Sequence, residues 1–335
     1  MLTELLDACG LNEAPAYLLV FVGVSLLMMW RLEAMLDHGL EGTALGTLIM
    51  PYCSGLGNLV FIGLMIAHKG APGEVLTNCL VNNVTNLTLL LGLPALWWGL
   101  EILPGKAKGA APRRRKGGAD AGTAGQLNRL SLLLTLAAAL FFTGAVWVLG
   151  DDGRLDASDG LMLIGLFLFW QCIQVFDVMK HNVRQRISYG PMFYVDLVVV
   201  IACAWFIYES LDWLLAWIGT QKGGFVSAAN LGWLSGWLMV LPNAVLALYW
   251  GWRRRADIVY SSQVGDGHIC IPLCLGLYAL FQPLPTAGFF TTGLGLLLGT
   301  IVAHAILLIV PGGLPRWAGG VLVAAYGWFL WQGLA

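Results

Sequence analysis

The sequence predicts an all-α integral membrane protein with about ten transmembrane helices in two inverted five-helix repeats. Its 335 residues are 58% hydrophobic and only 11% charged, which is too little charge to cover a soluble protein of this length. Apolar runs of about twenty residues recur along the whole chain, and each is long enough to cross a bilayer. Two of these runs carry matching polar residues, and that match indicates the repeat.

The apolar runs set the expected spans in order. They cover residues 17–36, 43–67, 75–100, 130–149, 160–180, 194–213, 231–252, 259–281, 288–310 and 317–334. The first residues, MLTELLDACGLNEAP, are acidic and lack a basic start. We therefore expect no cleavable signal peptide in this stretch.

Basic residues indicate the orientation, because they gather in loops that share one face of a ten-span bundle. These loops carry KAKGAAPRRRKGG, then Lys180 with Arg184 and Arg186, then RRR from Arg253, and finally Arg316. The opposite loops carry only Lys69, Arg154 and Lys222. Loops rich in Lys and Arg face the cytoplasm, so both termini are expected outside the inner (plasma) membrane. The loop at about 104–125 is expected to be flexible, cytoplasmic and in contact with anionic lipid.

Several function classes find no support in the sequence. It contains no zinc pattern, phosphate loop, G-x-S-x-G or H-E-x-x-H motif, so neither a cofactor nor an enzyme is expected. Six of the seven cysteines fall within the expected spans, where thiols usually behave as small apolar groups. The net charge of −1 gives no indication of nucleic-acid binding. No protein partner is indicated either.

An internal repeat joins two of the spans. TNCLVNNVTNLTLLLGL from Thr77 aligns with SSQVGDGHICIPLCLGL from Ser261, and both end in L-G-L. Residues four apart share a helix face, so each segment presents one polar stripe. The stripes are Asn78, Asn82 and Asn86 in the first segment, and Ser262, Asp266 and Cys270 in the second.

The span before each stripe is also unusual. Span two contains MPYCSGLGNLV, with Pro51 and Asn58, and span seven contains MVLPNAVLAL, with Pro242 and Asn243. Both are expected to break the helix within the membrane. An odd number of spans separates the two units, so they enter the membrane in opposite directions. We therefore expect repeats at residues 1–180 and 181–335, as is typical of secondary transporters.

With these features, the chain resembles the cation/calcium antiporter superfamily, the sodium/calcium exchangers. Their two inverted repeats carry G-T-S-x-P-E on spans two and seven and G-S-N-x-x-N/D on spans three and eight. The resemblance covers most of the chain and implies cation antiport. It also implies a site in which the family's ligand glutamates fall at Asn58 and Asn243. The positions of the other ligands and of the motif threonines are Ser54, Asn82, Asn86, Met239, Asp266 and Cys270.

These replacements change the expected ion. Of the implied positions, only Asp266 is a carboxylate, whereas calcium takes about 6–8 oxygen ligands and is usually held by several carboxylates. A buried divalent ion beside one negative charge would keep a net positive charge in a medium of low dielectric constant. A monovalent cation or a proton is therefore expected to suit the site better than calcium. The site would also suit a neutral polar solute held by hydrogen bonds from the asparagines.

Other polar residues within the spans are weaker candidates. His268, Asn83 and Thr85 lie off the stripes and are expected in packing or cavity-lining positions, and Asp177, Asp196 and His304 show no partner in the sequence. The alternative function is an exchanger-fold protein that does not transport and serves as a sensor or assembly partner. A membrane enzyme is the weakest hypothesis, because no catalytic cluster can be assembled.

Overall fold

The computed structural model describes residues 2–8, 10–11, 13–37, 50–102, 118–182, 190–286 and 288–334. Its first part contains α1 (Leu2–Ala8), α2 (Ala14–Asp37), α4 (Met50–Ser54), α5 (Leu56–Ala67), α6 (Pro72–Thr85), the π-helix η2 (Asn86–Leu90), α7 (Leu91–Trp98), β1 (Leu100–Glu101), α8 (Gly118–Leu149), the 3₁₀-helix η3 (Gly150–Asp152), β2 (Arg154–Leu155) and α9 (Ala157–Asn182).

The second part contains α10 (Pro191–Thr220), the 3₁₀-helix η4 (Ala228–Asn230), α11 (Leu231–Trp252), α12 (Ala256–Ile269), the π-helix η5 (Cys270–Cys274), α13 (Leu275–Phe281), β3 (Leu284–Pro285), α14 (Phe289–Ile309), β4 (Gly313–Leu314) and α15 (Arg316–Leu334). The prediction of an all-α membrane protein is therefore confirmed. The strands in the described residues are two residues long, and they form two antiparallel pairs at helix ends.

Eight helical segments in the described residues are long and apolar enough to cross a membrane. The other two expected spans are also helical, as α15 and as the short pair α4 and α5. The loop prediction at 104–125 was wrong in part, because α8 already begins at Gly118. Residues 104–117 of that loop lie outside the described residues, as do residues 38–49.

The two expected helix breaks have different outcomes. Span two is interrupted at Gly55, between α4 and α5. The prediction for span seven was wrong, because α11 continues through Pro242 from Leu231 to Trp252. A proline within a transmembrane helix is tolerated when neighbouring groups satisfy the freed backbone.

The interruption that the two units share is a π-helix instead. In the first unit η2 covers Asn86–Leu90, and in the second η5 covers Cys270–Cys274. These five-residue segments fall at equal positions in the alignment of the two polar stretches. Because π-helices are rare and often mark functional sites, their equal placement supports the repeat independently of residue type.

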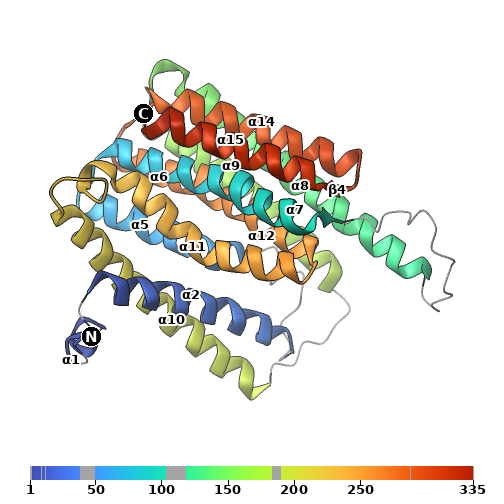
Figure 1. The fold of residues 1–335 in the computed structure, drawn as a ribbon, viewed down its shortest axis with the longest axis horizontal. Helices are drawn as coiled ribbons and strands as arrows, with labels where there is room; N and C mark the ends of the chain where they lie inside the picture. The colour runs from blue at the N-terminus through green and yellow to red at the C-terminus, as the bar shows by residue number, and fades with distance from the viewer. Residues whose placement is uncertain are drawn as a thin grey trace.

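The arrangement of the helices places these two units at the centre of the bundle. Figure 1 shows α2 and α10 side by side along one edge, with α6, α11 and α12 between them and the α14–α15 layer. The span Pro72–Trp98 has 83% of its apolar window buried, whereas the span Pro191–Thr220 has only 17%. α10 therefore presents most of its apolar surface outward, as expected for a helix in contact with lipid.

Two matching seams hold the bundle together. α7 packs on α15 through Gly92 and Gly319, and α13 packs on α9 through Gly276 and Gly160. A Cβ added at Gly319 would lie 2.6 Å from the Gly92 carbonyl oxygen, and one at Gly160 would lie 2.7 Å from that of Gly276. Glycines permit this close approach of helices in membranes.

Each seam ends in an antiparallel strand pair. β1 pairs with β4 next to the α7–α15 seam, and β2 pairs with β3 next to the α13–α9 seam. Span three (α7) therefore packs on span ten (α15) in the same way as span eight (α13) packs on span five (α9). This correspondence supports the proposal of two inverted repeats, while the division at residue 180 stays a prediction.

The start of α9 is fixed by a local cap. The Asp156 carboxylate accepts hydrogen bonds from the Ser158 hydroxyl at 2.6 Å and from the backbone N–H groups of Ser158 and Asp159. In turn, the Asp156 N–H donates to the Asp159 carboxylate at 2.9 Å. The Ser158 hydroxyl and these N–H groups lower the pKa of the Asp156 carboxyl from its ordinary value. Such a reciprocal cap stabilises the first turn of a helix.

Candidate ion-binding site

A chain of buried hydrogen bonds joins the two polar stripes. The Asn82 amide nitrogen donates to Asn58 Oδ1 at 3.2 Å. The Asn86 amide nitrogen donates both to Asn82 Oδ1 at 3.1 Å and to Asp266 Oδ2 at 2.8 Å. All four residues are at most 1% exposed. The structure thus brings together one residue of α5, one of α6, one of η2 and one of α12.

Local structure explains how these side chains reach one another. Asn82 and Asn86 lie one helical turn apart, so they share a face. Asn86 is the first residue of η2, and Cys270 is the first of η5. Asn78, at the other end of the first stripe, donates to Ser235 Oγ of α11 at 2.9 Å. The first stripe therefore contacts α11 at one end and α12 at the other.

Some polar atoms of this cluster lack a hydrogen-bond partner among the described residues. They are the Oδ1 atoms of Asn78, Asn86 and Asp266 and the Nδ2 atom of Asn243. Buried polar groups are normally satisfied, and an unpaired buried carboxylate oxygen is especially unfavourable. The carboxylate of Asp266 is therefore the group in this cluster with the strongest requirement for a proton or a cation.

Asn243 and Ser54 line a small cavity beside the hydrogen-bonded chain. The volume of this cavity is about 10 Å³. Residues of α2, α4, α10 and α11 and Gly57 of α5 line it. This space holds about one water-sized body. Asn58, Asn82, Asn86 and Asp266 thus form the hydrogen-bonded chain, whereas Asn243 and Ser54 line the adjoining cavity.

Cys270 has a different contact. Its thiol lies 3.9 Å from the Cys79 carbonyl oxygen of α6, in hydrogen-bonding geometry. Cys270 thus links η5 to α6, whereas the bonds of the amide chain pass through Asn86 and Asp266. Among the described residues, no group of three or more His, Cys, Asp or Glu side chains is placed to hold a metal ion.

The weaker candidates have packing contacts. Asn83 donates to the Cys79 carbonyl of its own helix at 2.7 Å, and Thr85 lies 3.2 Å from the Tyr326 hydroxyl. His268 Nε2 lies 2.8 Å from the Thr135 carbonyl oxygen, and its ring meets Phe142 and Trp170 edge-on. These contacts agree with the structural roles expected for residues off the stripes.

The structure also reveals partners that the sequence does not show. Arg31 of α2 lies 3.5 Å from the buried Asp196 carboxylate of α10. His304 of α14 is held between the Tyr260 hydroxyl at 3.0 Å and the Leu87 carbonyl oxygen of η2 at 2.7 Å. Leu87 lies in a π-helix, whose hydrogen-bond register no sequence pattern identified. The side chain of Asp177 lies outside the described residues.

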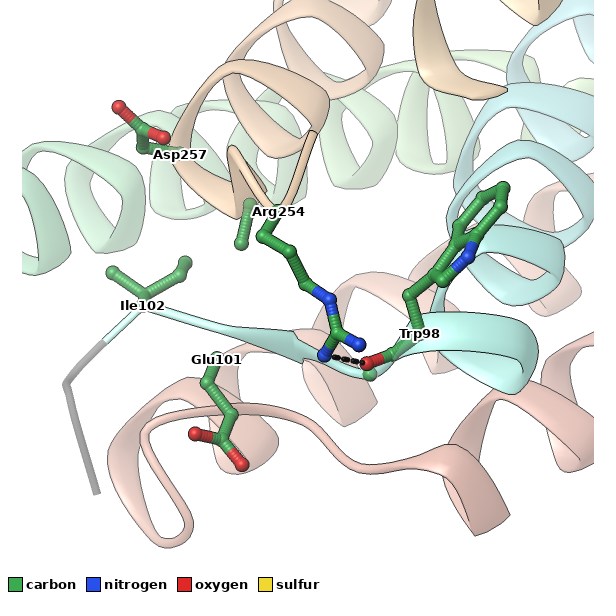
Figure 2. A pocket seen from close by; sticks show the side chains of 7 residues that line it. Trp98, Glu101, Ile102, Arg254 and Asp257 are labelled. Atoms are coloured by element: carbon green, nitrogen blue, oxygen red, sulfur yellow. Dashed lines mark hydrogen bonds between the residues drawn. The ribbon is translucent and has the colours of Figure 1, made fainter. Parts of the chain in front are cut away.

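A larger cavity of about 420 Å³ lies away from these residues, where α7 ends and α12 begins. Figure 2 shows the Arg254 side chain pointing to the Trp98 carbonyl oxygen, which it contacts at 2.9 Å, with Asp257 at the upper left and Glu101 at the lower left of the view. None of the sequence-predicted site residues lines this cavity. It is therefore separate from the candidate ion-binding site.

Comparison with known proteins supplies the family. The model of the family described as "Sodium/calcium exchanger protein" matches residues 16–176. A solved structure of the sodium-calcium exchanger NCX_Mj, soaked with 10 mM Na⁺ and zero Ca²⁺, superposes with a TM-score of 0.64 at 19% identity, covering 96% of this chain and 99% of that chain. Residues 16–176 therefore match the sodium/calcium exchanger family, while the exchanger fold extends over the whole chain.

A second NCX_Mj structure, soaked with 2.5 mM Na⁺ and 10 mM Sr²⁺, has a TM-score of 0.62 at 18% identity and covers 95% of this chain and 96% of that one. At these identities the superposition establishes the shared exchanger fold. The comparison with curated proteins found no match. The chain is a multi-pass membrane protein with the exchanger fold, and the family match of residues 16–176 bears out the resemblance inferred from its sequence.

Proposed function

We propose that the protein is a secondary active antiporter that exchanges a monovalent cation and a proton at Asp266, rather than an exchanger of calcium. The observation that carries this proposal is the Asn86–Asp266 hydrogen bond of 2.8 Å. It joins the polar stripes of the two repeat units through a single buried carboxylate. Asn58 and Asn82 extend the same hydrogen-bonded chain, and Asn243 lines the adjoining cavity.

Charge supports a monovalent ion. A carboxylate and a monovalent cation neutralise each other, whereas a divalent cation beside Asp266 alone would leave one positive charge in the membrane interior. Amide oxygens contribute dipoles but no compensating charge. Calcium would also require about 6–8 oxygen ligands, while the oxygens of Asn58 and Asn82 already accept hydrogen bonds from neighbouring amides.

The same carboxylate suits a proton. When Asp266 is ionised, one of its oxygens accepts the Asn86 amide hydrogen and the other lacks a donor among the described residues. A bound cation or an added proton would remove this unpaired negative charge. Because only one of them is needed, the two compete, and competition for one group is the basis of exchange.

A second candidate function is a membrane protein with the exchanger fold that does not transport. The observation that favours it is the mutual bonding of the amides, since Asn82 donates to Asn58 and accepts from Asn86. Amides that satisfy one another can serve only to hold helices together. This candidate predicts that Asp266 affects stability and that no ion flux exists.

Proton movement in proteoliposomes tests the proposal. Vesicles with an internal pH dye are given inward gradients of Na⁺ or K⁺. They contain the wild type, Asp266→Asn or the control Asp151→Asn, which makes the same chemical change at an exposed position of η3. We expect cation-driven proton movement in the wild type and the control, and none in Asp266→Asn, with all three proteins folded. Unchanged movement in Asp266→Asn removes this residue from the mechanism, and its absence from all three favours the non-transporting candidate.

A further inference from the structure

The small cavity beside the amide chain has an unusual wall. Three sulfur-containing side chains line it, from three different helices: Met29 of α2, Cys53 of α4 and Met239 of α11. Met29 and Met239 are 7% and 3% exposed, and Cys53 is half-buried. The oxygen-bearing side chains of the wall are Ser25, Ser54 and Asn243.

The Met239 sulfur enters this region because residue 57 is a glycine. A Cβ added at Gly57 would lie 2.7 Å from Met239 Sδ, which is closer than the two atoms can approach. The sulfur therefore occupies space that any larger residue at position 57 would take. Asn243 adds a second feature, because it is 1% exposed and its amide nitrogen has no partner among the described residues.

We propose that this cavity binds one soft monovalent cation, of the chemical class of Cu(I) and Ag(I), through the sulfur atoms of Met29, Cys53 and Met239. Thiolate and thioether ligands favour such cations over Na⁺, Mg²⁺ or Ca²⁺, which prefer oxygen. The space of about 10 Å³ admits one ion without its water shell. This inference goes beyond the proposed function, because it adds a second cation site beside the hydrogen-bonded chain of Asp266.

Charge balance is compatible with this class of ion. When Cys53 binds the cation, its S–H bond breaks, a sulfur–metal bond forms and the thiol proton leaves to solvent. One positive charge enters and one leaves, so the net charge of the cavity does not change and no oxidation or reduction occurs. The thioethers of Met29 and Met239 add ligands without adding charge.

Silver(I) is the probe, because it is soft and does not change its oxidation state under these conditions. Purified protein with Cys9 and Cys172 replaced by Ser is equilibrated with Ag(I), and bound silver is counted per protein by mass spectrometry. In this background, Cys53→Ser is expected to bind about one silver ion fewer. Met29→Leu and Met239→Leu, which keep side-chain size, are expected to weaken binding about tenfold or more, since even outer-shell changes weaken metal sites by 10- to 100-fold.

Two variants give the test its controls. Gly57→Ala keeps every ligand but displaces the flexible end of Met239, so it is expected to weaken silver binding as Met239→Leu does. Met162→Leu removes a thioether from an exposed position on α9, and it is expected to leave binding unchanged. A loss of silver binding in Cys270→Ser with none in Cys53→Ser would assign the silver to the other cysteines and overturn the proposal, as would equal silver binding in all variants.

The outcome also separates this inference from the proposed function. Proteoliposomes of the same variants are assayed for proton movement driven by Ag(I), Na⁺ and K⁺ gradients. Movement driven only by Na⁺ or K⁺, with no silver bound at Cys53, overturns the soft-cation site and leaves the antiporter. Silver bound at Cys53 without any proton movement supports the site and overturns the antiport function.

Discussion

Asn86 is the residue on which the polar chain depends, because its one amide group contacts both Asn82 and Asp266. Each neighbour would lose its hydrogen-bond donor if this side chain were shortened. Asn83 provides a comparison, since it is also buried and its amide nitrogen donates to the Cys79 carbonyl of its own helix. The amide nitrogen of Asn86, by contrast, donates to a carboxylate on another helix.

Asn86→Ala should destabilise the protein by about 0.5–2 kcal/mol more than Asn83→Ala, in line with measured hydrogen bonds between membrane helices. Thermal unfolding in detergent, followed by circular dichroism, would measure this difference. Asn86→Ala should also weaken the binding of the cation that drives proton movement. Equal stabilities of the two variants would show that the Asn86–Asp266 bond contributes little.

Calcium affinity tests the charge argument. The wild type is expected to bind calcium more weakly than about 1 μM, because Asp266 alone does not balance a divalent ion. Asn58→Glu combined with Asn243→Glu restores carboxylates at the family's two glutamate positions and should raise calcium affinity. Calorimetry measures both proteins. Tight calcium binding by the wild type would refute the argument from charge.

The sequence predicts much of this site but not all of it. Helical spacing places Asn82 and Asn86 on one face, and the structure joins them to Asn58 and Asp266 by hydrogen bonds. The Arg31–Asp196 contact of 3.5 Å could not be predicted, since nothing local relates residues so far apart in the chain. That the Cys270 thiol faces the Cys79 carbonyl depends on the packing of η5, which spacing does not reveal.

At the scale of helices, apolar runs predicted the spans well, because a bilayer demands a minimum length of apolar helix. Interruptions were harder to predict. Pro242 suggested a break in α11, where the helix is continuous. No residue type in the sequence predicted the π-helices η2 and η5. A π-helix depends on which carbonyl each N–H selects, and tertiary contacts such as that of His304 with Leu87 influence this choice.

The α7–α15 seam gives a prediction at the same scale. In Gly319→Ala the new methyl group would meet backbone atoms of α7, with the nearest at 2.5 Å, so the helices must move apart. We expect a loss of about 1–3 kcal/mol of stability, as for other overpacked interiors. Thermal unfolding in detergent measures it.

Gly320→Ala is the control for this seam. The added methyl group would have Leu96 Cδ1 as its nearest neighbour, at 3.9 Å, which is an ordinary contact. Its effect should stay within about 0.5 kcal/mol. Similar losses in both variants would mean that helix propensity, rather than the close approach at Gly319, sets the stability of α15.

For the whole molecule, the distribution of basic residues predicts that both termini lie outside the cytoplasm. In bacteria, alkaline phosphatase fused after Ala335 should be active, because this enzyme folds only outside the cytoplasm, and a fluorescent protein that matures in the cytoplasm should stay dark at the same position. The same pair fused within the loop after Glu101 should behave in the opposite way. Active phosphatase in that loop would reverse the orientation.

The two strands of the β1–β4 pair are synthesised at very different times. Leu100 pairs with Leu314, and the intervening chain of about 210 residues takes on the order of 10–40 s to synthesise at about 5–20 residues per second. During that time the face of α7 that carries Gly92 has no helix packed on it, because α15 has not yet been synthesised. This face is then accessible to chaperones and proteases. A nascent chain stopped before β4 should therefore be degraded faster than the complete protein in a pulse-chase experiment. Equal lifetimes would show that α7 is protected from degradation without α15.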